Sequence, residues 1–355
     1  WERQGTGTMD RVSYDNQSAP LHATPSGRTD PPAAARAGGS GAVRPRIGLI
    51  YNPRSHRNQG RDLDCTTDAS ITVAQPRSRD EIADALADFA KAGIDFLIIN
   101  GGDGTVRDVL TLGLQVFGDN WPAVAVLPKG KTNALNVDLG APADWSPERA
   151  IAAYTNGKRL TRRPLKVSRD GGTEPPMLGF IFGAGTFTHG IEVGQDAHAL
   201  GFFNSLAVGA TGAWGVLQAL FGTNRNKWRR GTPMSLKYLP SREPVERSPH
   251  GDADRRNIIL VSTLKQMPLG LQVYGAPRSG LKLAVLDRPR RRILASMPFI
   301  LMGWRPGWLA SAGFHQLDAE GLEAEVAEPV ILDGEAFPPG RYLIEQGPEI
   351  AFISE

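Results

Sequence analysis

The order of hydrophobic and polar residues divides the chain into a first part in which strands and helices alternate and a second part made mainly of strands. Short apolar runs predict buried strands over 46–53, 94–100 and 121–128. Apolar positions at helical spacing predict helices over 77–93 and 106–117, and a short helix within 130–140 that ends at Gly140. This alternation predicts a mostly parallel α/β layer structure over about residues 44–160.

The second part contains strand-like runs separated by glycine and proline. They cover residues 159–169, 176–185, 256–265, 280–287, 321–335 and 341–353. Runs of this length with such punctuation predict a mainly antiparallel β domain. The expected fold class is therefore α/β followed by all-β.

Two segments depart from this pattern. Residues 1–43 are rich in Ser, Gly, Pro, Ala and Arg, so we expect a disordered leader. Residues 201–222 carry no ionisable side chain, but their glycines, Asn204 and Ser205 favour a helix buried in or beside an apolar pocket over a bilayer span.

Composition excludes several kinds of site. The single cysteine, Cys65, rules out a disulfide framework and a thiolate metal cluster, and the six histidines show no zinc-binding spacing. With 40 Lys+Arg against 37 Asp+Glu, the net charge of +3 does not suggest a nucleic-acid partner. The first residues lack the features of a secretory signal, which favours a cytoplasmic protein.

Basic residues mixed with tryptophan mark a candidate membrane surface. NRNKWRRG (224–231) includes Trp228, and Arg288–Arg292 with GWRPGW (303–308) repeats the mixture. Such residues would suit an anionic lipid surface. The alternative, an ordinary solvated or half-buried surface, stays open at this point.

The motif GGDGT (101–105) carries the strongest chemical signal. Glycines directly after a buried strand allow a tight turn and expose N–H groups, and the following helix directs its positive end to the same place, which suits a polyphosphate. Asp103 would orient a magnesium ion or accept a proton, and Thr105 would cap the helix or contact phosphate. The alternative is an ordinary strand-to-helix turn with Asp103 as a structural cap.

A nearby stretch resembles a phosphate loop without being one. AVLPKGKT (125–132) has Ala125 where the G-x-x-x-x-G-K-[ST] pattern needs its first glycine. We reject this interpretation because the apolar strand continues through Leu127 and Pro128 lacks an N–H donor. Lys131 could still reach a phosphate from its own loop.

Two acidic residues occur together in VILDGEAF (330–337). Asp333 and Glu335 lie two residues apart, so on a strand both carboxylates would face one cleft, as base and metal chemistry requires. Asp-Gly is also a common hairpin turn, and taken alone the motif favours a plain turn.

Taken together, NPRS (52–55), GGDGT (101–105), LPKGKTNAL (127–135) and ILDGE (331–335) resemble the catalytic domain of the diacylglycerol kinase family, which includes sphingosine and ceramide kinases. The glycine loop is more distantly similar to that of NAD kinases and 6-phosphofructokinases. The resemblance implies an ATP-binding α/β domain over 44–160 and a β-sandwich domain with a lipid pocket over 161–338. It also implies an active cleft between them and a final strand over 339–355 that returns toward the first domain.

The resemblance also implies roles for particular residues. Asp333 matches the family's proposed catalytic base, Asp103 is the competing candidate, and Glu335 would support a metal or the geometry. Magnesium would be held by Asp103 and Glu335. The nucleotide would be held by Asn52, Pro53, Gly101, Gly102, Asp103, Gly104, Thr105, Gly130, Lys131, Thr132 and Asn133. The lipid pocket would include Phe187, His189, Phe202, Phe203 and Trp214.

Departures from the family pattern concern the substrate. His56 replaces a common glycine, Thr186–His189 lacks the acid of the family's G-F-D-A segment, and Asn133 is followed by Ala134 as in the sphingosine kinase branch. We therefore expect an ATP- and magnesium-dependent kinase that phosphorylates the primary hydroxyl of a diacylglycerol, ceramide or sphingoid base, with a slight preference for ceramide. It would act in the cytoplasm on the anionic inner membrane face.

Alternatives are a diacylglycerol kinase proper, a regulator that binds nucleotide or lipid without catalysis, and an NAD kinase. The oligomeric state, including a homodimer, stays open.

Overall fold

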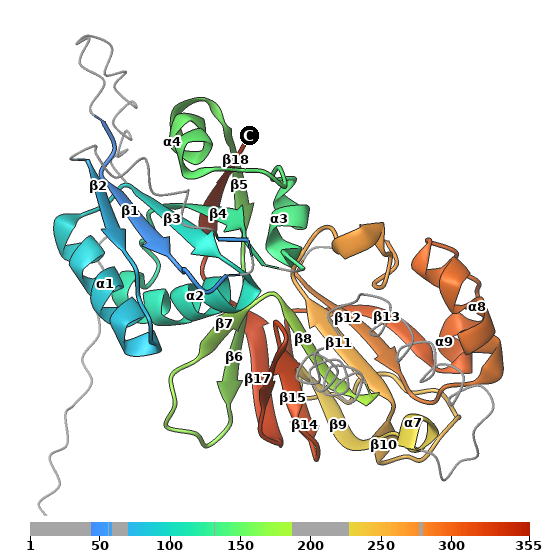
Figure 1. Cartoon of the computed structure of the whole chain (residues 1–355). Coiled ribbons are helices and arrows are strands. Elements are labelled where there is room, and N and C mark those ends of the chain that lie inside the picture. Colours follow the sequence, from blue (N-terminus) through green and yellow to red (C-terminus); the bar gives the residue numbers. More distant parts are fainter. Residues whose placement is uncertain (1–43, 56, 59–69, 131, 187–226, 277–279) are drawn as a thin grey trace, which may run out of the picture. The chain divides into compact units, whose positions relative to one another are not determined.

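A six-stranded sheet organises the first part of the chain (Figure 1). The computed structural model describes residues 44–55, 57–58, 70–130, 132–186, 227–276 and 280–355. The strand order is β2-β1-β3-β4-β18-β5, parallel except for β5. The strands are β1 (Ile47–Tyr51), β2 (Ile71–Ala74), β3 (Phe96–Gly101), β4 (Ala123–Pro128), β5 (Lys158–Arg162) and β18 (Ile350–Ser354).

Helices cover both faces of this sheet because alternate strand residues point to opposite sides. Leu97 and Ile99 of β3 pack with the apolar faces of α1 and α2, whereas Phe96 and Ile98 pack on the other side with α4. The helices are α1 (Arg79–Ala92), α2 (Asp103–Phe117), α3 (Ala134–Leu139) and α4 (Pro147–Asn156). The predicted helices over 77–93, 106–117 and 130–140 correspond to α1, α2 and α3 and are confirmed.

The second part is a sandwich of two antiparallel sheets, ordered β10-β9-β14-β17-β6-β7 and β13-β12-β11-β8-β15-β16. Apolar residues from both sheets form one buried core between them. The strands are β6 (Leu165–Arg169), β7 (Met177–Gly179), β8 (Ile181–Gly185), β9 (Thr232–Leu239), β10 (Arg255–Arg256), β11 (Ile258–Ser262), β12 (Leu281–Leu286), β13 (Phe314–Ala319), β14 (Gly321–Val326), β15 (Val330–Leu332), β16 (Glu335–Phe337) and β17 (Gly340–Gln346).

Short helices accompany the sandwich. They are α7 (Lys227–Arg230), α8 (Arg291–Leu301), α9 (Leu309–Ala312) and the 3-10 turn η2 (Pro268–Gly270). The buried side of α8 packs through Ile293 and Ile300 against residues of β12 and β13. The pattern did not predict α8, because its first turn contains arginines, no side chain caps it and Pro298 lies inside it.

Four predicted strands are each two strands in the structure. The run over 159–169 divides at Pro164 into β5 of the first sheet and β6 of the sandwich, and the run over 341–353 divides at Gly347 into β17 and β18. The run over 321–335 divides into β14 and β15, and the run over 176–185 divides at Phe180 into β7 and β8. Proline and glycine interrupt the ladder at the first two points, where the chain passes between sheets. The final strand that joins the first sheet is therefore Ile350–Ser354 alone, not the whole of 339–355.

Two sets of buried polar contacts connect the first part to the sandwich. The Thr111 hydroxyl of α2 accepts from Leu178 N at 2.9 Å and donates to Leu178 O at 3.3 Å. In α3, Asp138 accepts from Gln266 N of the second part at 2.6 Å, and it is held in place by Arg162 Nε of β5 at 2.5 Å. These contacts fix α2 and α3 relative to the strands that carry the second half of the site.

Some predictions lie outside the described residues. These are the leader over 1–43 and the apolar segment over 201–222. Within the described ranges, no helix combines the length and the apolar character needed to cross a membrane.

Candidate active site

Two glycine loops meet at the carboxyl ends of neighbouring strands. β3 and β4 pair in parallel with Gly101 opposite Pro128, so the loops that follow them lie side by side. A Cβ atom on Gly130 would lie 2.8 Å from the Cα of Gly102, and one on Gly102 would lie 3.0 Å from the Cα of Gly130. This close backbone approach explains why both positions are glycine.

The NPRS loop is hydrogen-bonded to the GGDGT loop. Asn52 Nδ2 donates to Thr105 Oγ1 at 2.8 Å, and the N–H of Gly102 donates to Ser55 Oγ at 3.3 Å. Pro53, expected to contact nucleotide, is exposed at the edge of this group. The structure therefore brings the first two motifs into one site.

Asp103 joins the GGDGT loop to the loop after β4. Its two carboxylate oxygens accept from Asn133 N at 2.9 Å and from Ala134 N at 3.0 Å, at the start of α3. Asn133 has a left-handed backbone with φ of 51°, and its side chain bonds the N–H and the C=O of Gly130, each at 2.8 Å. Asp103 is thus a structural cap, but of α3 rather than of its own helix.

Open space remains around the start of α2. A Cβ atom on Gly104 would meet no atom within 4 Å, and no side chain caps the N-terminus of α2 at Gly102. Thr132, in the loop after β4, is exposed. The 15-residue helix presents its positive end where the sequence predicted phosphate binding.

Asp333 comes from the sandwich and occupies a hairpin turn between β15 and β16. Asp333 and Gly334 both have left-handed backbones, with φ of 47° and 84°. The plain-turn interpretation is therefore correct for the backbone. The carboxylate is nevertheless held in a fixed position, since it accepts from Phe180 N at 3.0 Å and from Ile181 N at 2.8 Å.

The surroundings of Asp333 adjust its pKa. Desolvation raises the pKa of Asp333 to about 7, the hydrogen bonds from Ile181 and Phe180 oppose this rise, and the negative charge of Asp103 adds to it. The positive charge of Arg107 acts in the opposite direction. Asp333 and the glycine loop are thus close enough to influence each other electrostatically, and the carboxyl group titrates near neutral pH.

Arg107 is the site residue that sequence reasoning missed. It is buried on α2, one helical turn after Asp103, and it forms an ion pair with Glu335 and a 3.0 Å contact from Nη2 to Asp108 Oδ1. A buried arginine needs a partner of opposite charge. In the sequence, the signal for this residue was its position one helical turn after the glycine loop. Arg107 connects the helix that follows the GGDGT loop to the hairpin that carries Asp333.

Asp103 and Glu335 were predicted as magnesium ligands, and each has a protein partner in the structure. Glu335 is paired with Arg107, and within the described residues no group of three or more His, Cys, Asp or Glu side chains could hold a metal. Asp103 has lone pairs left beyond its two backbone contacts. The donor set therefore fits a magnesium ion that arrives on substrate phosphates and touches one carboxylate, not an ion caged by protein alone.

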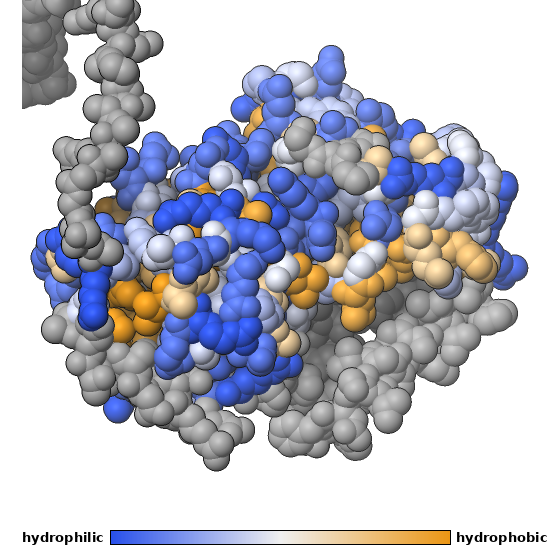
Figure 2. Space-filling view, turned by 90° about the horizontal axis from the view of Figure 1, so that it is seen from above, coloured by the Kyte–Doolittle hydropathy of each residue, from blue (hydrophilic) through white to orange (hydrophobic). Residues whose placement is uncertain are grey.

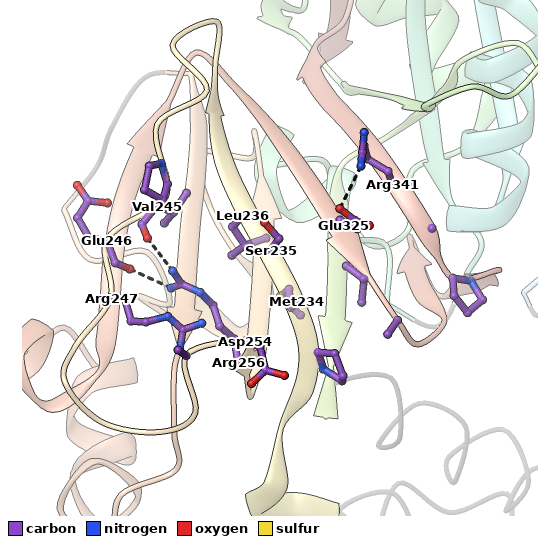
Figure 3. Close-up of a pocket in the computed structure, with 17 residues that line it drawn as sticks. Met234, Ser235, Leu236, Val245, Glu246, Arg247, Asp254, Arg256, Glu325 and Arg341 are labelled. Atoms are coloured by element: carbon purple, nitrogen blue, oxygen red, sulfur yellow. Dashed lines mark hydrogen bonds and ion pairs between the residues drawn. The ribbon is translucent and has the colours of Figure 1, made fainter.

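Several predicted residues lie outside the described part of the chain. They are Lys131 of the nucleotide site and Phe187, His189, Phe202, Phe203 and Trp214 of the lipid pocket. A pocket of about 940 Å³ does occur in the sandwich, near β9, β14 and β17 (Figure 3). Its wall includes Met234 and Leu236 together with Arg256, whose guanidinium donates to the C=O groups of Val245 and Glu246. Among the described residues, none of those predicted for the site lines this pocket.

Comparisons with known proteins find similar sequences among the lipid kinases. The family model described as the diacylglycerol kinase catalytic domain matches residues 46–167. A stretch of 52 residues is 40% identical to "Probable lipid kinase YegS" of Shigella flexneri, and it spans 15% of this chain and 17% of that relative. The protein of the same name from Escherichia coli O1:K1 / APEC gives the same identity over the same length.

Solved structures show the same fold. A diacylglycerol kinase structure from Bacillus anthracis str. Sterne matches with a TM-score of 0.57 at 15% identity, covering 88% of this chain and 97% of that one. A second structure from that organism reaches 0.60 at 16% identity, with the same coverage. The predicted fold class, α/β followed by all-β, is confirmed. Residues 46–167, which carry both glycine loops and Asp103, thus match the model of the diacylglycerol kinase catalytic domain.

Proposed function

We propose that this protein is an ATP-dependent lipid kinase that phosphorylates the primary hydroxyl of a diacylglycerol, ceramide or sphingoid base. The observation that carries the proposal is the position of Asp333. A carboxylate with a pKa of about 7 comes from the sandwich to within electrostatic reach of Asp103 in the glycine loop. A group that titrates near the working pH is suited to accept a proton and to release it again.

The nucleotide would bind where the loops after β3 and β4 meet. Gly102 and Gly130 keep side chains away from the backbone there, and the open space beside Gly104 leaves room for phosphate oxygens. The free N-terminal end of α2 would stabilise their negative charge. Magnesium bound to the phosphates and to Asp103 would neutralise further charge during transfer.

Asp333 would act as the base in the transfer step. Its carboxylate takes the proton of the lipid hydroxyl as the lipid oxygen bonds to the γ-phosphorus, and the bond from that phosphorus to the β–γ bridging oxygen breaks to release ADP. Hydrogen bonds from Phe180 and Ile181 orient the carboxylate, and the Arg107–Glu335 pair holds the hairpin against α2. Such catalysis depends mainly on positioning and charge neutralisation.

Asn133 followed by Ala134 supports including sphingolipids among the substrates, because this pair resembles the sphingosine kinase branch. "Probable lipid kinase YegS", the relative matched over 52 residues, supports a lipid acceptor of some kind. We infer a slight preference for ceramide over diacylglycerol.

The test offers the full chain labelled ATP and magnesium with diacylglycerol, monoacylglycerol, ceramide and sphingoid bases in mixed micelles, and with NAD in a parallel reaction. We expect label in one lipid and a loss of about 10²- to 10⁴-fold in Asp333→Asn. Label in NAD alone would assign the protein to NAD phosphorylation. ATP binding without transfer to any acceptor would support the non-catalytic regulator.

A further inference from the structure

Exposed apolar side chains gather in one part of the sandwich. Within the described residues, five large hydrophobic side chains are exposed, and four of them lie between positions 269 and 304: Leu269 at 91%, Phe299 at 60%, Met302 at 81% and Trp304 at 49%. The fifth, Val137, is on α3. We call the group of four the α8 face. A cluster of this kind marks an interaction surface, whereas single exposed apolar residues are ordinary.

The α8 face comes from two adjacent segments. The N–H of Gln272, after η2, donates to the C=O of Leu301 at 2.8 Å, which places the η2 loop beside the end of α8. The rings of Phe299 and Trp304 lie 6.5 Å apart, and Trp304 lies 6.0 Å from Trp308. Figure 2 shows apolar surface on the side of the molecule that carries α8 in Figure 1.

Folding does not require these side chains. The opposite side of α8 supplies the buried residues Ile293 and Ile300, which pack against the sandwich. The outward side chains instead keep a large apolar area in water, at a cost of roughly 25 cal/mol for each Å². A partner that removes this area from water would recover that free energy.

The segment that carries three of the four α8-face residues is rich in arginine. Between positions 288 and 310 the chain has five arginines and no Asp or Glu. Arg291 and Arg292 stand in the first turn of α8, where the helix dipole disfavours cations. The guanidinium of Arg292 lies 3.8 Å from the centroid of the Trp308 ring, so charge and aromatic surface are in direct contact.

One further arginine, Arg229, lies near two of these five. Burial lowers the pKa of Arg229 on α7, and the positive charges of Arg288 and Arg291 lower it further. Three guanidinium groups from two segments therefore lie within electrostatic reach of one another, which adds positive potential near the start of α8.

We propose that the α8 face docks on an anionic lipid bilayer, with its four apolar side chains in the interfacial layer and the nearby arginines against phosphate headgroups. Aromatic rings beside arginines match the chemistry of that layer, which is apolar on one side and negatively charged on the other. Docking is independent of the reaction, but its purpose, access to a lipid acceptor, rests on the proposed kinase function.

The experiment measures how much of the full chain sediments with vesicles of phosphatidylcholine alone, and with vesicles that also contain about 30% phosphatidylglycerol. We expect binding only to the anionic vesicles, weaker at high salt. Arg291→Ser with Arg292→Ser should weaken it about 30-fold, at about 1 kcal/mol for each arginine. Phe299→Ser with Trp304→Ser should also weaken it, whereas the control Val137→Ser should not.

Activity assays separate this inference from the proposed function. If the Phe299/Trp304 variant loses phosphorylation of vesicle lipid but keeps that of a short-chain soluble lipid, both proposals are supported. Vesicle binding by a protein that phosphorylates no lipid would leave the docking proposal standing and refute the kinase. Equal vesicle binding by wild type and both double variants would overturn the docking proposal. So would a dimer that these substitutions convert to a monomer while vesicle binding is unchanged, because the face would then serve a second copy.

Discussion

Acidification from pH 8 to pH 6 should reduce lipid phosphorylation about tenfold, because Asp333 can accept a proton only in its ionised form. Desolvation raises its pKa to about 7 from an ordinary value of 3.8. With that pKa, the ionised fraction falls from about 0.9 at pH 8 to about 0.1 at pH 6. A carboxylate in water would stay ionised over this whole range.

Stability should respond to pH with a defined sign. The folded chain holds the Asp333 proton more tightly than the unfolded chain, so this contribution to stability is fully present below about pH 4 and is lost as the pH rises through about 7. Asp333→Asn cannot ionise, and asparagine tolerates the left-handed turn. The melting temperature of Asp333→Asn minus that of wild type should therefore grow as the pH rises from 4 to 7.

The assay is kcat/KM with labelled ATP from pH 5.5 to pH 9. The γ-phosphate also titrates near this range, with a second phosphate pKa of about 6, so a matched pair of variants is needed. Arg107→Gln removes a charge that lowers the pKa of Asp333, and its midpoint should move to higher pH. Arg149→Gln, on α4, removes an exposed arginine paired with Glu355, and its midpoint should stay with wild type.

Two results would refute this role of Asp333. One is an active enzyme whose kcat/KM is flat between pH 6 and pH 8. The other is near-normal turnover in Asp333→Asn, which would leave Asp103 as the remaining candidate base.

Two further predictions concern the glycine loops and the buried charges. Gly130→Ala places a methyl group against the GGDGT backbone and should lower both thermal stability and ATP affinity. In Gly104→Ala the methyl group meets no atom, so this variant should raise the melting temperature slightly and weaken only ATP binding. Unchanged calorimetric ATP affinity in Gly104→Ala would exclude phosphate from that space. Arg162→Met strands the buried Asp138 and should cost about 3–5 kcal/mol in urea unfolding. Arg163 forms an exposed ion pair with Glu349, so Arg163→Met is the control and should cost about 1 kcal/mol or less. Equal losses of stability in the two variants would contradict the burial argument.

Local elements could be predicted because their signals are local. Ser78 and Gly93 bound α1 through side-chain and left-handed caps, and a continuous apolar run made β3 a buried strand. The two glycine loops could also be predicted, because a tight backbone turn requires glycine. Motif order along the chain then indicated the family and, through it, the meeting of Asp333 with the glycine loop.

Only the tertiary structure decided which distant groups meet. Asp103 caps α3 across two loops, and Arg107 pairs with Glu335 from a hairpin more than two hundred positions away in the chain. Likewise, the pKa of Asp333 depends on desolvation and on backbone donors at Phe180 and Ile181, which periodicity cannot place next to it. Backbone propensity acts over a few residues, whereas packing and electrostatics act between whatever the folded chain brings together. The sequence thus determined the elements and the chemical groups, and the fold determined their partners.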